Sequence, residues 1–372
     1  MQVVAHSRFG WHTLLLVGAL GGIGSGLEAQ QPEQYSIRGD EVAIYNLAGQ
    51  VRIEPGPGPA VTAELTRGGA EAGKLKVARS ETEGRQSLRV IYPADKIQYS
   101  AMTDGSSTQL RVKEDGTFND SDSDDDGHEH HKRHEEGRQV TIAKSGGLDA
   151  HADLKVTVPR GKEVAIYLAV GKVTAANVEG DLKIDASNAP VTSSNSRGDI
   201  DIDVGSGAVQ VTKQSGELQI ETGSGEVSVS DVSGESVSIE TGSGGVSGSN
   251  VKSNELSINT GSGDIDVSNL NAPQVNLDTG SGSVTTDMSG ELWNLSVNTG
   301  SGDVTVKAPP TLGAEVDIET SSGDIETDFE VSVTRHARDH MTGRIGDGRG
   351  KIAIETGSGE IKLVKNATAR GT

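Results

Sequence analysis

The chain of 372 residues contains no cysteine, few aromatic residues and far fewer basic than acidic side chains. Without cysteine it can form no disulfide, no thiolate metal site and no thiol nucleophile. Aromatic residues make up 3% of the chain, so aliphatic side chains must fill its core. The formal net charge of −21 argues against nucleic acid as a partner, because that binding depends on Lys and Arg neutralising phosphates.

The chain has only one long apolar stretch, and it lies at the N-terminus. It runs from about Trp11 to Leu27, follows the basic residue Arg8, and leads to a small residue at Ala29. This order is typical of a secretory signal peptide, which we predict over residues 1–29. A membrane anchor is the alternative, but five glycines interrupt the stretch and leave it short of the ~20 apolar residues that spanning requires. We therefore expect an exported protein with no transmembrane segment in its mature chain.

A repeat of roughly 19 residues dominates the second half of the chain. Each copy contains a short turn whose sequence is usually Thr-Gly-Ser-Gly. The turns open at Gly205, Gly223, Gly242, Gly261, Gly280, Gly300, Ser321 and Gly357. Successive openings are 18, 19, 19, 19, 20, 21 and 36 residues apart, so the last interval contains an insertion.

Aliphatic residues recur at fixed offsets on both sides of these turns. In the copy around Gly261 they are Leu256, Ile258, Ile265 and Val267, with polar residues between them. Alternation with a period of two predicts strands with one buried face. Weaker copies surround Ala169 and Ser187, and one isolated copy surrounds Leu47.

The fold class predicted from this repeat is all-β, a parallel β-solenoid resembling a right-handed single-stranded β-helix. About ten coils are expected over residues 164–364, followed by a tail over 365–372. A single copy buries too little apolar surface to offset its conformational entropy, so neighbouring copies must stack. A meander of antiparallel hairpins is the alternative, but it would place identical residues on alternating edges.

Residues 30–163 contain strand-like runs that do not follow the repeat. The runs are 61–65, 74–77, 87–92, 109–112, 139–142 and 153–158. We expect an N-terminal β-sheet region that caps the first coil, because an open solenoid end would expose unpaired strand edges. An N-terminal domain independent of the solenoid is the alternative.

An acidic and histidine-rich segment interrupts this region. Its composition predicts a disordered loop over residues 115–138. His128, His130, His131 and His134 are the candidate ligands for a transition metal. Adventitious metal binding by a solvated loop is the alternative interpretation.

The second interruption is a basic, glycine-rich insertion from about Thr334 to Gly350. Loops held by a rigid scaffold often carry function. The plainer interpretation, a long exposed loop before the last coil, is the expectation here.

Two series of outward-facing residues are rich in carboxylates. Two positions before the turn are Asp203, Glu221, Glu240, Asn259, Asp278, Asn298, Glu319 and Glu355. Three positions after it are Ala208, Glu226, Gly245, Asp264, Ser283, Asp303, Asp324 and Glu360. Stacked carboxylates could bind calcium, but the spacing differs from the calcium-binding nonapeptide repeat. A solvated acidic face is the favoured interpretation.

The sequence offers no set of residues that would form a catalytic site, and no cofactor is predicted. A polysaccharide-cleaving β-helix enzyme would need two carboxylates at a defined separation and aromatic residues that stack on sugars. After Tyr167 the only aromatic residues are Trp293 and Phe329. Since the acids simply repeat, we expect the protein not to be an enzyme.

The repeats resemble those of the bacterial putative-adhesin β-strand-repeat family, whose function is unknown. The resemblance rests on residues 256–267, on 153–161 before the repeats and on 346–363 at their end, and it spans about 153–364. It implies a β-helix-like fold in a bacterial envelope or secreted protein, and it implies no catalytic residues.

These patterns together predict a non-enzymatic, extracytoplasmic repeat protein. Its solenoid would present a regular polar face to an envelope partner, either a protein or a cell-wall polymer. A structural spacer without a ligand and a cation-binding surface protein are the alternatives.

Overall fold

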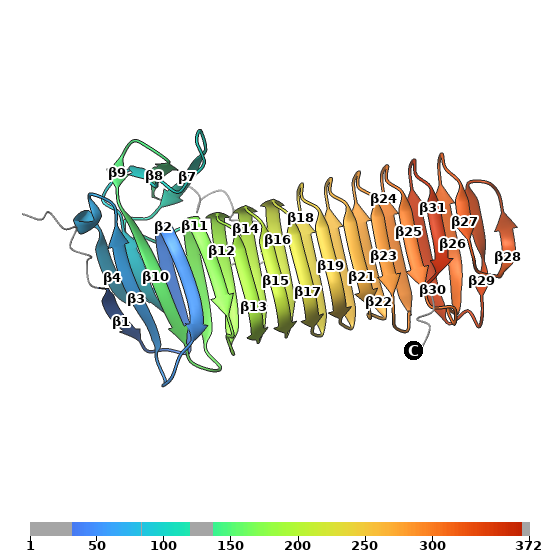
Figure 1. Ribbon diagram of the computed structural model, residues 1–372, viewed down its shortest axis with the longest axis horizontal. Helices are drawn as coiled ribbons and strands as arrows, with labels where there is room; N and C mark the ends of the chain where they lie inside the picture. Colours follow the sequence, from blue (N-terminus) through green and yellow to red (C-terminus); the bar gives the residue numbers. More distant parts are fainter. Residues whose placement is uncertain (1–31, 83, 120–136, 367–372) are drawn as a thin grey trace, which may run out of the picture. The chain divides into compact units, whose positions relative to one another are not determined.

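The computed structural model describes residues 32–82, 84–119 and 137–366. Within these ranges the regular secondary structure is β-strand, apart from one 3-10 turn at Ala72–Lys74. The strands between Glu163 and Lys365 stack by parallel pairing, apart from one hairpin near the C-terminus (Figure 1). The all-β class and the parallel solenoid predicted from the repeat are confirmed.

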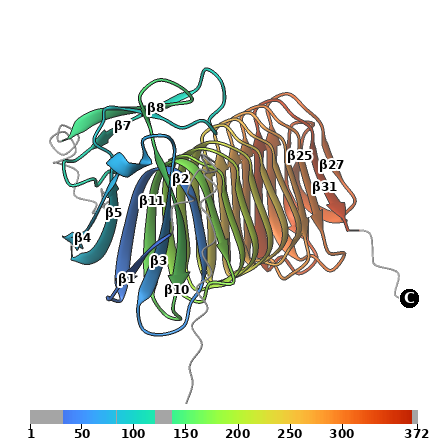
Figure 2. The same cartoon turned by 60° about the vertical axis from the view of Figure 1, so that its left-hand side comes forward.

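Each coil consists of one strand before the Thr-Gly-Ser-Gly turn and one strand after it. The pre-turn strands, in stacking order, are β12 (Asp181–Asn188), β14 (Ile200–Ser206), β16 (Leu218–Ser224), β18 (Ser236–Thr241), β20 (Glu255–Thr260), β22 (Gln274–Thr279), β24 (Asn294–Thr299), β30 (Gly350–Thr356) and β26 (Ala314–Thr320). The post-turn strands are β13 (Val191–Arg197), β15 (Val209–Ser215), β17 (Val227–Ser233), β19 (Val246–Lys252), β21 (Ile265–Leu270), β23 (Val284–Met288), β25 (Val304–Ala308), β31 (Ile361–Lys365) and β27 (Ile325–Thr327). They form two layers, which Figure 2 shows from nearer one end of the stack.

Two long strands join these layers at the start of the stack. β2 (Glu41–Pro55) and β11 (Glu163–Ala176) each run through both layers and pair in parallel over almost their whole length. Val42 lies opposite Val164, and Val51 lies opposite Val173. The isolated copy around Leu47 is therefore the first coil of the same stack, although more than a hundred residues separate it from the second.

The core lies between the two layers and is filled by the aliphatic columns of the repeat. Leu256, Ile258, Ile265 and Val267 are each at most 1% exposed, and the equivalent residues of the other coils are similarly buried. The alternation between buried and exposed residues follows from the strand geometry, because successive side chains point to opposite faces.

The buried threonine of the turn links each coil to its neighbour. The Thr260 hydroxyl accepts a hydrogen bond from the Gly263 amide at 3.1 Å and donates one to the Gly244 carbonyl oxygen of the preceding coil at 3.1 Å. Thr279 and Thr299 repeat both bonds one and two coils further along. One hydroxyl thus closes its own turn and binds the turn of the preceding coil.

The turn glycines are required by close stacking rather than by backbone conformation. A Cβ atom added at Gly244 would overlap the Gly225 carbonyl oxygen of the preceding coil, and Gly263 and Gly282 have the equivalent contact. None of these three glycines has a left-handed φ. A left-handed backbone therefore does not explain the choice of glycine in these coils.

Left-handed residues occur instead on the return side of the coil, within the post-turn strands. They form a regular series of non-glycine residues: Asn177, Asn195, Lys213, Asp231, Asn250 and Asn269. Several side chains in this series bind the next, as when the Asn269 amide donates to Asn250 Oδ1 at 2.8 Å. Asn and Asp tolerate the left-handed conformation better than other side chains, which explains their choice at this corner.

The last coils do not stack in the order in which they follow along the chain. The final strands β30 and β31 lie between the coil of β24 and β25 and the coil of β26 and β27. In the pre-turn layer Ile352 therefore has Leu295 on one side and Val316 on the other. The last coil along the chain is therefore not the last coil of the stack.

The insertion before the final coil is a hairpin rather than a long loop. β28 (Val331–His336) and β29 (His340–Ile345) pair with each other, and β29 pairs antiparallel with β26. An ion pair between Arg338 and Asp324 at 2.8 Å and a hydrogen bond between His340 Nε2 and Asp317 Oδ1 at 3.0 Å fasten the hairpin to the coil of β26 and β27. The interpretation of 334–350 as an exposed loop is corrected accordingly.

The strands that precede the stack pair with both halves of β2. β10 (His151–Val158) pairs in parallel with the second half of β2, and β3 (Val61–Gly68) and β1 (Glu33–Ile37) follow it outward. β5 (Arg85–Ile91) pairs with the first half, and β4 (Lys76–Thr82) lies outside β5. These strands cover the edge of the first coil in both layers.

A separate small sheet contains the remaining strands. It consists of β6 (Lys96–Gln98), β7 (Ser107–Val112), β8 (Arg138–Ala143) and β9 (Leu148–Asp149). The buried Tyr92 hydroxyl, just before this sheet, donates to Asn46 Oδ1 at 2.8 Å. This bond ties the N-terminal region to the first coil.

Candidate functional site

One outward column of the pre-turn layer combines aromatic, acidic and amide side chains. Strand pairing places its members directly beside one another in adjacent strands. In stacking order they are Tyr45, Tyr167, Asp185, Asp203, Glu221, Glu240, Asn259, Asp278, Asn298, Glu355 and Glu319. We call Asp185, Asp203, Glu221 and Glu240 the acidic column, because these four successive rungs all carry a carboxylate.

The aromatic start of the column is covered by another part of the chain. Tyr45 and Tyr167 stack with ring centroids 4.4 Å apart, and Phe118 meets Tyr45 edge-on at 6.0 Å. Phe118 is 2% exposed, and Gly116 and Thr117 are also buried, although the sequence placed them in a disordered loop. The contact of Phe118 with Tyr45 covers the end of the column that lies next to the N-terminal region.

Asn119 connects that covering segment to the acidic column. Its side-chain amide donates to Asp185 Oδ1 at 2.9 Å and to Ser187 Oγ at 3.3 Å. Desolvation raises the pKa of Asp185 to about 7, the Asn119 hydrogen bond opposes the shift, and the neighbouring Asp203 carboxylate adds to it. The pKa of Asp203 is raised for similar reasons, first by desolvation and then by Glu221 and Asp201.

The raised pKa of Asp185 predicts that stability depends on pH. The folded protein holds this proton up to about pH 7, whereas the ordinary carboxyl loses it near 3.8. Folding therefore takes up a proton between these values, so stability should fall as the pH rises through this window and then level off. Asp185→Asn keeps an acceptor for Asn119 and removes the titration.

We expect Asp185→Asn to stabilise the protein at pH 8 by about 1–3 kcal/mol, since one pKa unit is ~1.4 kcal/mol and solvent screens part of the shift. At pH 4 the variant and the wild type should be equally stable. Urea unfolding at both pH values measures the difference. The control is Asp278→Asn, which is in the same column and also accepts from an asparagine amide, that of Asn298 at 3.0 Å, but lies away from the covering segment of Phe118 and Asn119. An equal pH-dependent gain there would contradict the assignment.

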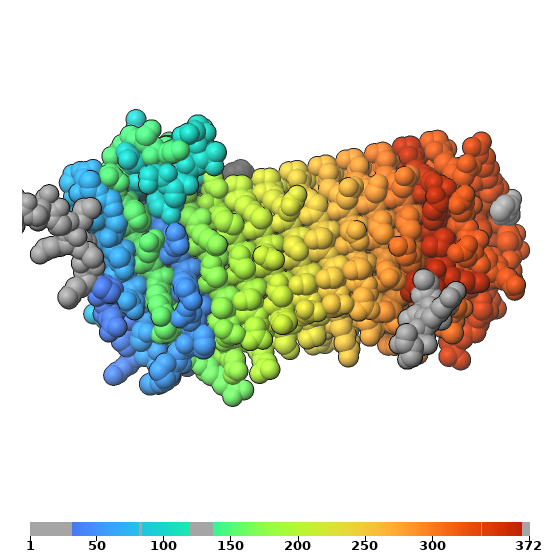
Figure 3. Space-filling model, viewed as in Figure 1, coloured from blue at the N-terminus to red at the C-terminus, as the bar shows by residue number. Residues whose placement is uncertain are grey.

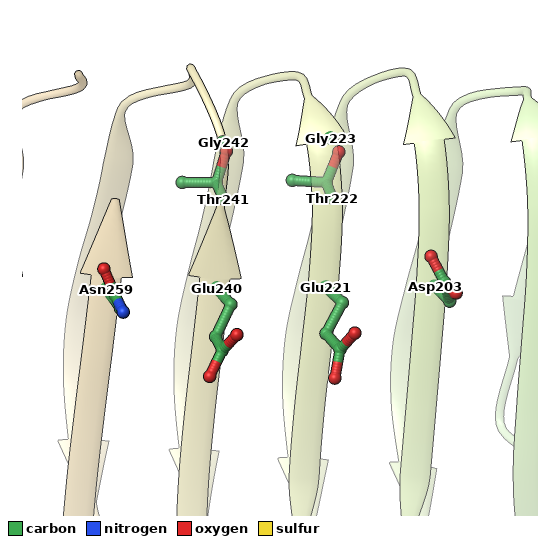
Figure 4. A pocket seen from close by; sticks show the side chains of 8 residues that line it. All are labelled: Asp203, Glu221, Thr222, Gly223, Glu240, Thr241, Gly242 and Asn259. Carbon is green, nitrogen blue, oxygen red and sulfur yellow. The ribbon is translucent and has the colours of Figure 1, made fainter. Parts of the chain in front are cut away.

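Beyond Asp185 the acidic column borders an open groove of about 340 Å³. Its lining includes Asp203, Glu221, Glu240 and Asn259 on four successive strands, together with turn residues above them (Figure 4). The Gln219 amide donates to Glu221 at 2.9 Å. The side chains of Asp203, Glu240 and Asn259 are exposed. The groove therefore presents carboxylate acceptors at a regular spacing of one coil.

The second carboxylate series, which follows the turn, holds the coils together. Asp264 Oδ1 accepts the Ser283 amide of the next coil at 2.8 Å, and Asp303 Oδ1 accepts the Glu360 amide at 2.9 Å. These aspartates satisfy backbone donors at a corner of the coil. They are explained by stacking and need no ligand.

The structure shows no preformed metal site in the ranges that it describes. There, no group of three or more His, Asp or Glu side chains is arranged to hold a metal ion. His128, His130, His131 and His134 lie outside the described residues, so metal binding by them stays a prediction.

The two aromatic residues considered for sugar stacking lie in different environments. Phe329 is 7% exposed at the end of the core, whereas Trp293 is 63% exposed on the return side of its coil. The groove has no aromatic residue in its lining. The pairing of carboxylates with aromatic platforms that a polysaccharide-cleaving site requires is therefore not present in this groove.

Sequence reasoning found Asp203, Glu221 and Glu240 of the acidic column, but it missed Asp185 and the aromatic beginning of the column. Tyr45 and Tyr167 occupy the same offset in their copies as Asp203 does in its own, so the column could have been extended from the repeat. No sequence signal indicates that Phe118 and Asn119 reach it, because they lie outside the repeat.

The chain belongs to the Toastrack DUF4097 family, whose profile matches residues 95–364. The match confirms the resemblance to a β-strand-repeat family of unknown function. The match identifies the family and its architecture and assigns no activity, because the family description names none.

Among solved structures, a putative cell adhesion protein from Clostridium sporogenes is similar to this chain. The two share 11% sequence identity over 90% of this chain and 100% of that chain, with a TM-score of 0.18. No curated protein matches the chain. Among the described residues there is no helix of the length and apolarity needed to cross a membrane.

Proposed function

We propose that the protein is a non-enzymatic, extracytoplasmic repeat scaffold that presents its acidic groove to an envelope partner. The observation that carries this proposal is the run of carboxylates on successive coils, open to solvent and held at a fixed spacing. A partner that matches this surface must offer cationic or hydrogen-bond-donor groups at intervals along an extended chain. A cell-wall polymer with free amines and an extended basic segment of a protein both have that chemistry.

The groove is suited to recognition because its geometry is fixed before a partner arrives. Main-chain ladders hold the strands of the groove, so the backbone that carries the carboxylates loses little freedom on binding. Complementary charge mainly accelerates encounter and selects partners, and it is weakened by salt. The N-terminal apolar stretch supports the extracytoplasmic location, where such a partner would be found.

The test is cosedimentation of the purified protein with cell-wall sacculi, together with recovery of envelope proteins on the immobilised protein. The Glu221→Gln/Glu240→Gln double variant should lose binding, and the wild type should lose it as salt increases. Asp266→Asn/Asp287→Asn is the matched control, because it removes the same charge from strands of the post-turn layer. Equal binding by all three proteins, or no binding by any, would refute the proposal.

A further inference from the structure

The two layers of the stack end at different points beyond the coil of β26 and β27. In the pre-turn layer β29 pairs with β26 and β28 pairs with β29, so the layer continues for two more strands. In the post-turn layer β27 pairs with β31 and with no other strand of the described ranges. The pre-turn layer therefore overhangs the post-turn layer (Figure 1).

The overhanging hairpin extends the inner, core-facing side of the layer. Residues directly opposite each other in paired strands lie on the same face. Val316 lies opposite Gly343, which lies opposite Val333, and the buried Val316 faces the core. Val333 therefore projects from the inner face, yet it is 48% exposed. Trp293 and Val333 are the two large hydrophobic side chains exposed within the described residues.

Only part of this inner face is open, and the crossover into β28 lies at its closed end. The chain passes from β27 to β28 through residues 328–330, and Phe329 in this link is buried. Val331, next along β28, is half-buried, whereas Ser332, Val333, Thr334 and Arg335 are all exposed. The open part of the overhang therefore begins after Val331.

Two strands at this end also have unpaired main-chain edges. β28 pairs only with β29, and β27 only with β31, among the strands that the structure describes. Free strand edges recruit further strands unless charge, proline or a bulge blocks them. β28 has no proline, and both the charged Arg335 and the irregularity in its pairing with β29 come after Val333, so Val331, Ser332 and Val333 form a regular, uncharged edge.

We propose that two copies of this chain join end to end here, each overhang filling the space left by the shorter layer of the other. In this joint the partner's β28 lies beside β27, and β28 lies beside the partner's β27. The four free edges are paired, and Val333 is covered by the partner's overhang. The contact is isologous and closed, so it gives a dimer rather than a fibre.

The strand directions are compatible with this joint. β28 runs in the same direction as β26, because two successive antiparallel pairings separate them. β27 follows β26 through the turn and runs the opposite way. A two-fold axis parallel to the strands exchanges the two layers without reversing any strand, so the partner's β28 meets β27 in antiparallel orientation.

The second copy fits this site better than an unrelated peptide because it closes both edges and both overhangs at once. The contact is small, since β27 has 3 residues and β28 has 6. Small interfaces usually give weak association, so we expect a dissociation constant in roughly the micromolar range. This inference is independent of the acidic groove and of the proposed function.

Sedimentation velocity of the full chain over a concentration series tests the proposal. We expect a reversible monomer–dimer equilibrium whose dissociation constant rises at least about tenfold in Val333→Asp, since the joint would bury an unpaired charge. Trp293→Asp changes the other exposed hydrophobic side chain and should leave the equilibrium unchanged. A monomer at every concentration, or a dimer that Val333→Asp does not weaken, would overturn the proposal.

A cross-linking measurement covers the possibility that Val333→Asp disturbs the hairpin itself. The chain has no cysteine, so Val333→Cys introduces a single thiol per copy. A short bismaleimide should link two copies of Val333→Cys into a covalent dimer and leave Trp293→Cys monomeric. Failure of Val333→Cys to link above its dimerisation concentration, or equal linking of both variants, would contradict the joint.

Discussion

Replacing Gly244 by alanine is expected to lower the free energy of unfolding by about 3 kcal/mol. The added Cβ would overlap the carbonyl oxygen of Gly225 on the preceding coil. A backbone oxygen cannot rotate away as a side chain can, so relief requires the two coils to separate. Separation weakens the main-chain bonds and the threonine bond between them. Urea unfolding followed by circular dichroism would measure the loss, which we expect together with reduced cooperativity between the two sides of the substitution.

The adjacent residue provides the control for this prediction. A Cβ atom at Gly245 would have its nearest heavy atom, the Asp264 carbonyl oxygen, at 3.6 Å, which is an ordinary contact. Neither glycine has a left-handed φ, so backbone conformation does not distinguish them. Gly245→Ala should change stability by less than about 0.5 kcal/mol. A similar loss in both variants would mean that alanine acts through the turn and not through the stack.

The sequence predicted the coils well because each coil makes the same demands on its residues. Leu256 and Ile258 repeat a pattern that only a stack can bury, and this pattern also identified the distant copy around Leu47. The order of the final coils could not be obtained in this way. β30 has nearly the same apolar pattern as its neighbours, so the pattern fits equally well between β24 and β26 or after β26.

The candidate site was predictable only where it repeats. Glu221 and Glu240 were identified from their offset, and their outward direction follows from strand alternation. The contact of Asn119 with Asp185 joins residues 66 positions apart and obeys no period. The same limit applies to Val333, whose exposure depends on where the post-turn layer ends. Contacts made by segments outside the repeat require the tertiary structure.

Thr260→Val is expected to cost about 2 kcal/mol, although it exchanges side chains of nearly the same shape. The Thr260 hydroxyl accepts from the Gly263 amide and donates to the Gly244 carbonyl, both at 3.1 Å. Valine leaves these two buried backbone groups without that partner, and an unmet buried group costs ~1–3 kcal/mol. Urea unfolding at neutral pH would measure the difference.

Thr222 tests whether the hydroxyl or the shape of the threonine column matters. It begins the column, one coil after Val204, and its buried hydroxyl has no hydrogen-bond partner. Thr222→Val therefore removes a polar atom whose burial is not compensated, and it should be neutral or stabilise the protein by up to about 1 kcal/mol. If Thr222→Val and Thr260→Val were equally destabilising, the column would act through packing alone. The opposite signs expected here would instead mean that the shape of the repeated threonine serves the core. The hydroxyl would then serve the contact between coils, which holds successive short turns together in the stack.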